Sequence, residues 1–300
     1  KITTACFEPS LDYCVLKMPR WDLNKFQRVS KKLGSSMLSV GEVMAIGRTF
    51  EDVMQKACRM VNPALNGLSG QDSGLVLDES KQSLEEQLRI PTDTRLFAVQ
   101  AALEKGWSVD KVHSLTKIDR WFLSKLKNIA TMRQACLDKN GLEDLVSENG
   151  SERLRSLKMA GFSDRQIAMY CGAPSGLIGE AKVRMFRKQF GVVPFVKQID
   201  TLAAEFPAQT NYLYMTYSGD SDDIPKAKHT SYVTLPGIDT KPAVPSSPRV
   251  GSRLGGETIE DAKERGVMVL GCGAYCFGSS VEFDWWAVSA ARQLRRDGFN

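Results

Sequence analysis

The sequence predicts a mixed fold in which a mainly α-helical central block is flanked by two shorter α/β pieces. Within about residues 92–206, apolar side chains recur at steps of three and four, as in Leu96, Val99 and Leu103. This spacing places them on one face of a helix. Short apolar runs next to glycines occur on both sides of the block and favour strands. Each flanking piece is too small to build a sheet alone, so we expect it to be part of a larger domain.

Length and composition place the chain among globular proteins. Its 300 residues suggest about two domains, and a hydrophobic share of 42% is sufficient for a sizeable core. The net charge of +5 permits an anionic partner without arguing for one. No run of about eighteen apolar residues occurs, so we predict no membrane partner.

The cysteines and histidines argue against a metal site. Seven cysteines are scattered without a Cys-x-x-Cys pair, and the two histidines are His113 and His229. Zinc sites draw on clustered cysteines and histidines, so we expect none here. Unpaired, scattered cysteines favour a reducing compartment, and we expect the cytoplasm.

The N-terminal piece is predicted to hold two strands and a helix. Leu11–Trp21 is expected to form a strand that ends at Pro19, and Ser39–Thr49 places an apolar run between glycines, which suits a buried strand. Phe50–Val61 has the apolar spacing of an amphipathic helix. Glu42 lies inside the second strand, where a carboxylate requires a partner or a polar cavity.

The central block follows a polar segment, residues 63–91, which we expect to be a loop. A second helical stripe in the block consists of Ile118, Phe122, Leu126 and Ile129. Two capping boxes are predicted from residue pairs three positions apart: Thr116 with Asp119, and Ser163 with Gln166. Three glycines are expected to end helices, because glycine enters the left-handed conformation freely: Gly106, Gly161 and Gly191.

A short repeat occurs twice in the block. Glu104–Val112 and Met159–Ile167 share a glycine, an aromatic residue and a serine cap, and each predicts a helix, a tight turn and a second helix. Two helical hairpins that bury their stripes against each other are one interpretation. A helix-turn-helix module that binds nucleic acid is the alternative. The basic residues within Ala181–Phe190 fit a solvated helix face or, in that alternative, a nucleic-acid stripe.

Beyond the block the composition changes. Asn211–Tyr217 alternates and is rich in aromatic residues, which predicts a strand. Residues 218–265 carry five prolines among serines and charges, which is the composition of a mobile linker.

The C-terminal piece is predicted to be one strand–turn–helix unit of a Rossmann-like sheet. Val267–Leu270 is an apolar strand, and a glycine-rich turn follows it. Ser279 or Ser280 can cap a helix that runs to about Arg296. Glu282 falls in the first turn of this helix, a position that acidic residues favour in any case.

Five segments, taken in order, resemble the large, synthetase part of carbamoyl phosphate synthetases. They are Phe7–Phe26, Ser39–Ala57, Leu115–Leu126, Val196–Tyr217 and Val267–Trp285. The resemblance covers nearly the whole chain apart from the Pro-rich linker, and it is closest to the multifunctional pyrimidine-pathway polypeptides. In this family, two ATP-grasp halves flank a helical oligomerisation domain.

The resemblance implies four regions. They are the end of the first ATP-grasp domain (1–65), the oligomerisation domain (66–217), a linker (218–265) and the start of the second pre-ATP-grasp domain (266–300). It also implies an activity for the parent protein: a ligase that makes carbamoyl phosphate from bicarbonate, glutamine-derived ammonia and two ATP. The intermediates pass through an internal tunnel.

By the family pattern, Glu42, Ser280 and Glu282 line that tunnel, where a buried carboxylate would order water in a dry passage. ATP and Mg²⁺ are implied for the parent, but no catalytic, cofactor-binding or metal-binding residue transfers to this chain. We therefore expect the chain alone to be inactive and to have a structural, oligomerising role. Its implied partners are the rest of its own synthetase chain, the glutaminase domain and further copies of itself, with no nucleic acid.

Overall fold

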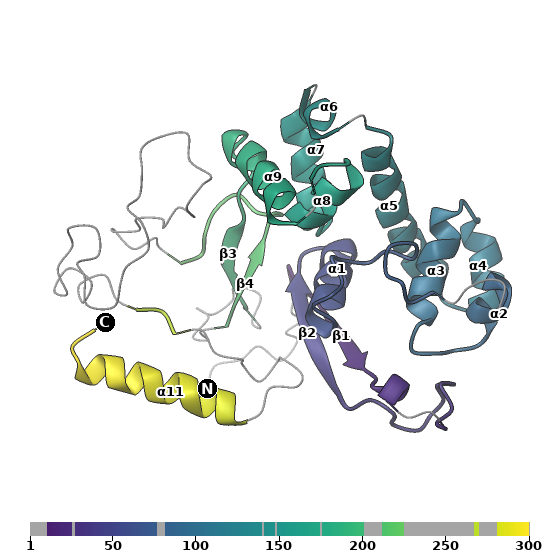
Figure 1. The fold of residues 1–300 in the computed structure, drawn as a ribbon, viewed down its shortest axis with the longest axis horizontal. Coiled ribbons are helices and arrows are strands. Elements are labelled where there is room, and N and C mark those ends of the chain that lie inside the picture. Colours follow the sequence, from purple (N-terminus) through teal and green to yellow (C-terminus); the bar gives the residue numbers. More distant parts are fainter. Residues whose placement is uncertain are drawn as a thin grey trace, which may run out of the picture. The chain divides into compact units, whose positions relative to one another are not determined.

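The structure is a computed structural model, and it describes residues 11–25, 28–76, 82–139, 141–147, 149–174, 176–200, 212–224, 267–269 and 281–299. The chain divides into two compact units, Lys1–Ile224 and Pro225–Asn300 (Figure 1). Most of the predicted linker and the whole glycine-rich turn before the last helix lie outside the described residues.

The first unit begins with a β-hairpin packed on a helix. Strand β1 (Cys14–Arg20) pairs antiparallel with β2 (Gly41–Gly47), and α1 (Phe50–Val61) lies against both. The side chains that face α1 include Met18, Val43 and Ala45, which are buried. The apolar run predicted a buried strand, and β2 is buried on the face that lies against α1.

The sequence predicted that the strand ends at Pro19. In the structure Pro19 lies within β1, which continues to Arg20. β1 is an edge strand with a single partner, so a residue without an N–H donor is tolerated there. A one-turn 3-10 helix, Leu23–Lys25, follows the strand.

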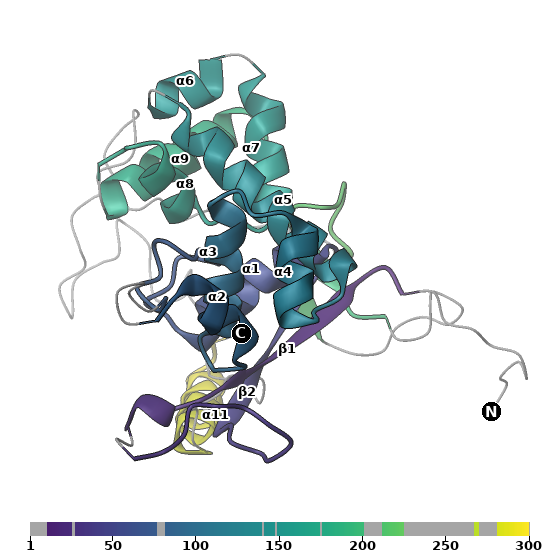
Figure 2. The same ribbon diagram turned by 90° about the vertical axis from the view of Figure 1, so that its right-hand side faces the viewer.

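Eight helices follow in the described part of the first unit: α2 (Leu84–Arg89), α3 (Arg95–Glu104), α4 (Val109–Thr116), α5 (Arg120–Leu137), α6 (Leu142–Ser147), α7 (Gly150–Met159), α8 (Asp164–Tyr170) and α9 (Leu177–Gln189). The long helix α5 contacts α3, α4 and α8, so it joins two helical groups. Figure 1 shows α8 and α3 on opposite sides of α5, and Figure 2 shows the same helices turned by 90°. The predicted loop of residues 63–91 thus contains one short helix, α2.

The buried face of α5 differs in part from the predicted stripe. Leu126 and Ile129 are buried as expected, together with Leu123. Phe122 is instead 44% exposed. Apolar residues at steps of three and four can be assigned to more than one face of a helix. The contacts of α5 with α1, α3 and α4 bury the face that contains Leu123 in place of the face that contains Phe122.

Both copies of the repeat form a helix, a tight turn and a helix. Gly106 after α3 has φ of 82°, and Gly161 after α7 has φ of 83°, in the left-handed region that favours glycine. Ser108 then caps α4, and Ser163 caps α8 in a complete capping box with Gln166. Gly191 after α9 is also left-handed. These boundaries are confirmed.

The predicted capping box between Thr116 and Asp119 is wrong. Thr116 is the last residue of α4, and its hydroxyl donates to the Val112 carbonyl oxygen. Lys117, with φ of 60°, ends that helix, and Asp119 caps α5 by accepting from the Trp121 amide at 2.8 Å. Thr116 has a helical backbone at the end of α4, and its hydroxyl oxygen accepts from the Ile118 amide at 3.1 Å, so Asp119 and not Thr116 is the N-cap of α5.

The first unit closes with a second hairpin. Strand β4 (Leu213–Thr216) lies within the predicted strand, and it pairs antiparallel with β3 (Phe195–Gln198), which was not predicted. Asp222 and Asp223 bind β3: the Asp222 carboxylate accepts from the Val196 amide, and Asp223 contacts Lys197 at 2.9 Å. The first unit therefore extends to Ile224, beyond the predicted start of the linker at residue 218.

The described part of the second unit consists of Val267–Val269, α11 (Val281–Arg296) and the three residues that follow this helix. The helix ends where the sequence predicted. Val267–Val269 has no strand assignment, in contrast to the predicted strand. A lone βα unit has no neighbouring strands to satisfy its backbone hydrogen bonds, so an apolar run alone does not establish a strand.

Candidate functional site

Glu42 lies on the outer face of the β1–β2 hairpin. In the hairpin register Pro19 is opposite Glu42 and Lys17 is opposite Met44. Opposite residues in an antiparallel pair point to the same side of the sheet. Glu42 and Lys17 therefore share the face that points away from α1, at diagonal positions.

The two side chains form an ion pair, with Lys17 Nζ at 2.8 Å from Glu42 Oε1. Glu42 therefore has a partner, which is one of the two alternatives that the sequence predicted. The side chain of Glu42 is 50% exposed, so in this chain it is not the buried carboxylate that the resemblance implied. The sequence did not identify Lys17 as the partner of Glu42, because the proximity of the two residues depends on the register of the hairpin. The alternation of side chains along β1 indicates only the face on which Lys17 lies.

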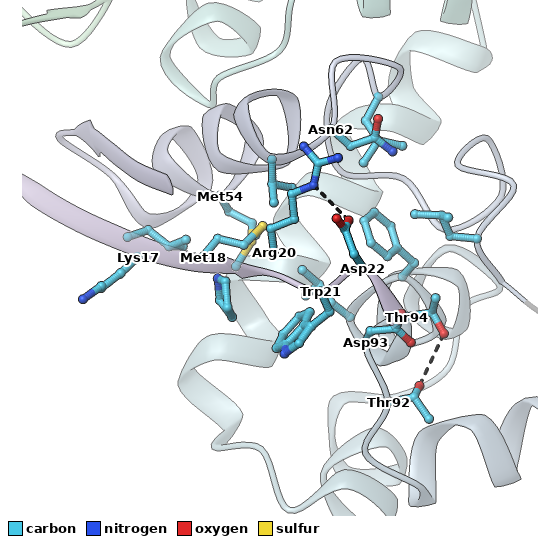
Figure 3. Close-up of a pocket in the computed structure, with 17 residues that line it drawn as sticks. Lys17, Met18, Arg20, Trp21, Asp22, Met54, Asn62, Thr92, Asp93 and Thr94 are labelled. Atoms are coloured by element: carbon cyan, nitrogen blue, oxygen red, sulfur yellow. Dashed lines mark hydrogen bonds and ion pairs between the residues drawn. The ribbon is translucent and has the colours of Figure 1, made fainter. Parts of the chain in front are cut away.

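Two cavities border β1, and Lys17 lines both. The first has a volume of about 500 Å³ and lies between β1, the end of α1 and the start of α3 (Figure 3). The second has a volume of about 600 Å³ and lies between β1, the start of α1 and the start of α5. The hairpin thus has a cavity on each side of Lys17 along the strand.

The first cavity is apolar with a few polar groups at one end. Trp21 and Met54 line its walls, and Arg20 Nε contacts the Asp22 carboxylate at 3.3 Å. Hydrogen bonds from Lys25 and Arg20 hold the pKa of Asp22 below its ordinary value. Asp93 has a buried carboxylate oxygen without a hydrogen-bond partner among the described residues. The cavity brings together no nucleophile with a base, so it offers binding surface and no catalytic pair.

An aromatic cluster borders the second cavity. The rings of Trp121 and Phe122 lie 5.6 and 5.4 Å from that of Phe50. Trp121 is 52% exposed, and the Lys125 ammonium lies over its ring. Large exposed aromatic side chains gathered in one place are typical of an interaction surface.

Lys56 connects the first hairpin to the second. Its ammonium donates to the Ile46 carbonyl oxygen of β2 at 2.9 Å, to the Met215 carbonyl oxygen of β4 at 2.7 Å, and to the Asp52 carboxylate at 3.0 Å. Arg48 adds a hydrogen bond of 3.3 Å to the Tyr214 hydroxyl. The end of the helical block therefore returns to the strand that carries Glu42.

A buried charge cluster holds α7, α8 and α9 together. The Asp164 carboxylate contacts Lys158 at 2.7 Å and Arg187 at 2.8 Å, and all three side chains are at most 10% exposed. Burial raises the pKa of Asp164, but Lys158 and Arg187 outweigh it and hold that pKa below its ordinary value. Arg187 is thus a structural residue.

The interpretation as a nucleic-acid module is not supported. A recognition helix must keep its outer face free to enter a groove. Helix α8, the second helix of its hairpin, contacts α5 and α9 and buries Gln166, Ile167 and Tyr170. Arg187, one of the basic residues of α9, is buried in the charge cluster and is not part of an exposed basic stripe. The remaining basic residues are an ordinary solvated face.

The other two predicted tunnel residues belong to the second unit. Ser280 lies outside the described residues. Glu282 is in the first turn of α11, as predicted, and its side chain is not described. The structure therefore gives the surroundings of Glu42 alone.

Within the part of the chain that the structure describes, there is no group of three or more His, Cys, Asp or Glu side chains that could hold a metal ion. The same part contains no helix that is long and apolar enough to cross a membrane. The described cysteines, Cys14, Cys58, Cys136 and Cys171, are not in disulfides. Burial raises the pKa of Cys58 to about 12, which leaves an unreactive thiol.

Two family models match different parts of the chain. Residues 42–191 match the family described as the carbamoyl-phosphate synthetase large chain, oligomerisation domain. Residues 263–300 match the carbamoyl phosphate synthase preATP-grasp domain. The first match includes β2 and α1 and ends just after α9, so it begins earlier than the predicted boundary at residue 66 and ends before β3.

Curated relatives match along nearly the whole chain. Multifunctional protein URA2 of Saccharomyces cerevisiae is 47% identical over 296 residues, which are 98% of this chain and 11% of the relative. The mitochondrial arginine-specific large chain of carbamoyl phosphate synthase from Schizosaccharomyces pombe is 46% identical over 301 residues, or 99% of this chain and 21% of the relative. Multifunctional protein CAD of Squalus acanthias is 45% identical over 297 residues, or 99% and 11%.

The chain thus spans between about a tenth and about a fifth of the length of these relatives. The oligomerisation-domain match alone covers half of the chain, and the preATP-grasp match follows it in the order that the resemblance implied. This chain belongs to the family of the carbamoyl-phosphate synthetase large chain.

Proposed function

We propose that the chain is the central part of a glutamine-dependent carbamoyl phosphate synthetase. The parent ligase makes carbamoyl phosphate from bicarbonate, glutamine-derived ammonia and two ATP. The observation that carries the proposal is the order of the two family matches within one chain, supported by relatives that bear the name carbamoyl phosphate synthase. ATP and Mg²⁺ belong to the parent, because phosphoryl transfer depends on donors and metal ligands positioned around the triphosphate.

Pyrimidine synthesis in the cytoplasm is the pathway and compartment that we propose. The resemblance to multifunctional polypeptides supports it, whereas the name of one relative refers to an arginine-specific, mitochondrial chain. Sequencing the parent transcript tests the choice. An aspartate transcarbamoylase domain downstream of this chain supports the pyrimidine pathway, and a transcript without it contradicts that pathway.

The chain itself has a structural role in this proposal. Its helical block links the two synthetase halves and carries two exposed aromatic side chains, Trp121 and Phe122, which pack beside Phe50 and are suited to contact further copies. The glutaminase domain and the rest of the synthetase chain are its other partners. A cytoplasmic multifunctional enzyme requires no contact with nucleic acid or membrane.

Glu42 is the residue of this chain that we place beside the passage for intermediates. It lies on an outward sheet face whose neighbouring side chains are mostly apolar. Once other parts of the parent cover that face, a carboxylate there can accept hydrogen bonds from water or ammonia and hold them in a dry passage. Ser280 and Glu282 are proposed for the same passage from the family pattern.

The test uses the full-length parent with Glu42→Ala and with Glu282→Ala. Each variant is expected to keep bicarbonate-dependent ATP turnover largely intact and to make less carbamoyl phosphate, because the intermediate leaks or stalls between sites. Glu85→Ala is the control, since Glu85 is 49% exposed and pairs with Lys111 on the helical surface. If both activities fall in proportion, or neither falls, Glu42 and Glu282 are not passage residues.

A further inference from the structure

Lys17 and Glu42 are placed together by the hairpin and not by proximity in sequence. They come from different strands and lie on one diagonal of the sheet, two residues from direct opposition. Their charged atoms are 2.8 Å apart, the distance of a charge-assisted hydrogen bond. Figure 3 shows the Lys17 side chain extending away from Met54 of α1, toward the outer side of the sheet.

On the two strands of the hairpin, the face that carries the pair holds no other ionisable residue. The residues that share this face are Val15, Lys17, Pro19, Glu42, Met44 and Ile46. Four of these six are apolar, so Lys17 is the one cation of the two strands that is directed to the side of Glu42. Arg20, the nearest other cation on β1, alternates to the opposite face and contacts Asp22.

The contribution of the Lys17–Glu42 ion pair to stability depends on how far the two side chains are exposed to water. With 60% of Lys17 and 50% of Glu42 exposed, water screens the attraction and the pair contributes little to stability. The same carboxylate covered by apolar surface would lose its hydration, and a lone buried carboxylate is strongly unfavourable. A cation at hydrogen-bond distance offsets that loss and restricts the carboxylate to one orientation.

We propose that Lys17 is a positioning residue for Glu42: in the assembled parent it keeps the Glu42 carboxylate charged and oriented beside the passage for intermediates. This inference rests on the proposed function of Glu42. Lys17 also contributes to the lining of both cavities beside β1, which lie on the α1 side of the strand, while its ammonium is on the outward face with Glu42. It acts through Glu42 and does not itself react.

The experiment compares Lys17→Met, Lys17→Arg, Glu42→Gln and the double variant Lys17→Met/Glu42→Gln in the full-length parent. The quantity measured is the number of ATP molecules consumed per carbamoyl phosphate formed. Lys17→Met is expected to raise this ratio by about threefold or more, and Lys17→Arg to restore most of the parent value, because arginine keeps the charge. Lys25→Met is the matched control, since Lys25 forms an exposed ion pair with Asp22 on the same hairpin.

The double variant separates positioning from packing. If Lys17 acts through Glu42, the double variant has the ratio of Glu42→Gln alone, and the two changes are not additive. If Lys17→Met keeps the parent ratio while Glu42→Ala uncouples, the inference is overturned and the proposed function stands. If Lys17→Arg is as defective as Lys17→Met, the role is one of shape and the inference also fails. If Glu42→Ala itself does not uncouple, both fail.

Discussion

The Lys56 ammonium of α1 donates a hydrogen bond of 2.7 Å to the Met215 carbonyl oxygen of β4, across 159 residues of sequence. The same ammonium binds the Ile46 carbonyl oxygen at 2.9 Å, so one side chain joins the two hairpins. Lys56 is half-buried, and a donor shared by two backbone acceptors limits their separation, because each hydrogen bond forms only over a narrow range of distance. The helical block thereby begins and ends at neighbouring points.

Replacing Lys56 with methionine should release β4 from β2. The variant keeps the apolar stem but leaves two carbonyl oxygens and the Asp52 carboxylate without their donor, at an expected cost of about 2 kcal/mol in the free energy of unfolding. Hydrogen exchange should accelerate first in residues 212–224. Lys111→Met is the control, because its ion pair with Glu85 is exposed and should matter by less than about 0.5 kcal/mol. Unchanged exchange in β4 would show that other contacts hold the hairpin.

The Lys56→Met variant should also respond differently to pH. Burial raises the pKa of Asp52 above its ordinary value, and Lys56 opposes that rise. The folded chain thus binds this proton more tightly than the unfolded chain, so the contribution of Asp52 is greatest below the unfolded pKa of about 3.9 and is lost as pH rises through the folded pKa. Thermal unfolding between about pH 4 and 7 should show a larger loss of stability in the variant than in the parent chain.

The two glycines of the repeat should differ in their tolerance of alanine. Both have φ near 80°, so alanine is strained at either site by about 1 kcal/mol. An added Cβ at Gly161 would also lie 2.8 Å from the Asp52 Cα of α1, whereas a Cβ at Gly106 meets nothing within 4 Å. Gly161→Ala should therefore lower the melting temperature clearly more than Gly106→Ala, by a further cost of about 2 kcal/mol. Equal melting temperatures would mean that the turn at Gly161 does not lie against α1.

Replacing Asp164 with asparagine should be among the most damaging changes in the helical block. It leaves the buried charges of Lys158 and Arg187 without their anion, at a cost of about 3–5 kcal/mol. Asp110→Asn is the control: Asp110 also pairs with an arginine, Arg120, but its side chain is 77% exposed. Urea unfolding of both variants measures the difference, and similar midpoints would contradict the buried cluster.

Acid sensitivity gives a second readout of Asp164. Its folded pKa is held below the ordinary value, so its contribution to stability is present above the unfolded pKa of about 3.9. That contribution is lost as pH falls through the folded pKa. The parent chain should therefore lose stability on acidification below about pH 4, and Asp164→Asn should lose less over the same interval. An identical acid response in the two would assign the acid sensitivity to other carboxylates.

Self-association should depend on the aromatic cluster. We expect the chain, and the segment 82–217 by itself, to associate at tens of micromolar, an order of magnitude typical of weak contacts. Changing both Trp121 and Phe122 to serine should abolish association in light scattering, because exposed aromatic rings supply most of the apolar area available there. Leu177→Ser is the control, since Leu177 is 82% exposed at the start of α9. A parent chain that is monomeric at this concentration would contradict the prediction.

The sequence by itself determined the turns of the two helical hairpins and the helix that follows β2, whereas α2 lies in a segment that was predicted to be a loop. Gly106, Gly161 and the Ser163–Gln166 capping box mark boundaries through local backbone chemistry, which operates within four residues and is therefore legible in the chain. The helix Phe50–Val61 followed from its apolar spacing. The family could also be predicted from the sequence, because five long segments resemble it in the same order.

Only the tertiary structure decided what depends on contacts between distant segments. The burial of Leu123 in place of Phe122 follows from which neighbours α5 has. Strand β3 could be assigned only from its pairing with β4. Pro19 is tolerated within a strand because β1 is at the edge of its sheet. The Lys17–Glu42 pair requires a hairpin register, and the Lys56 bridge requires two hairpins to meet. Periodicity assigns a residue to a face, but packing decides what that face touches.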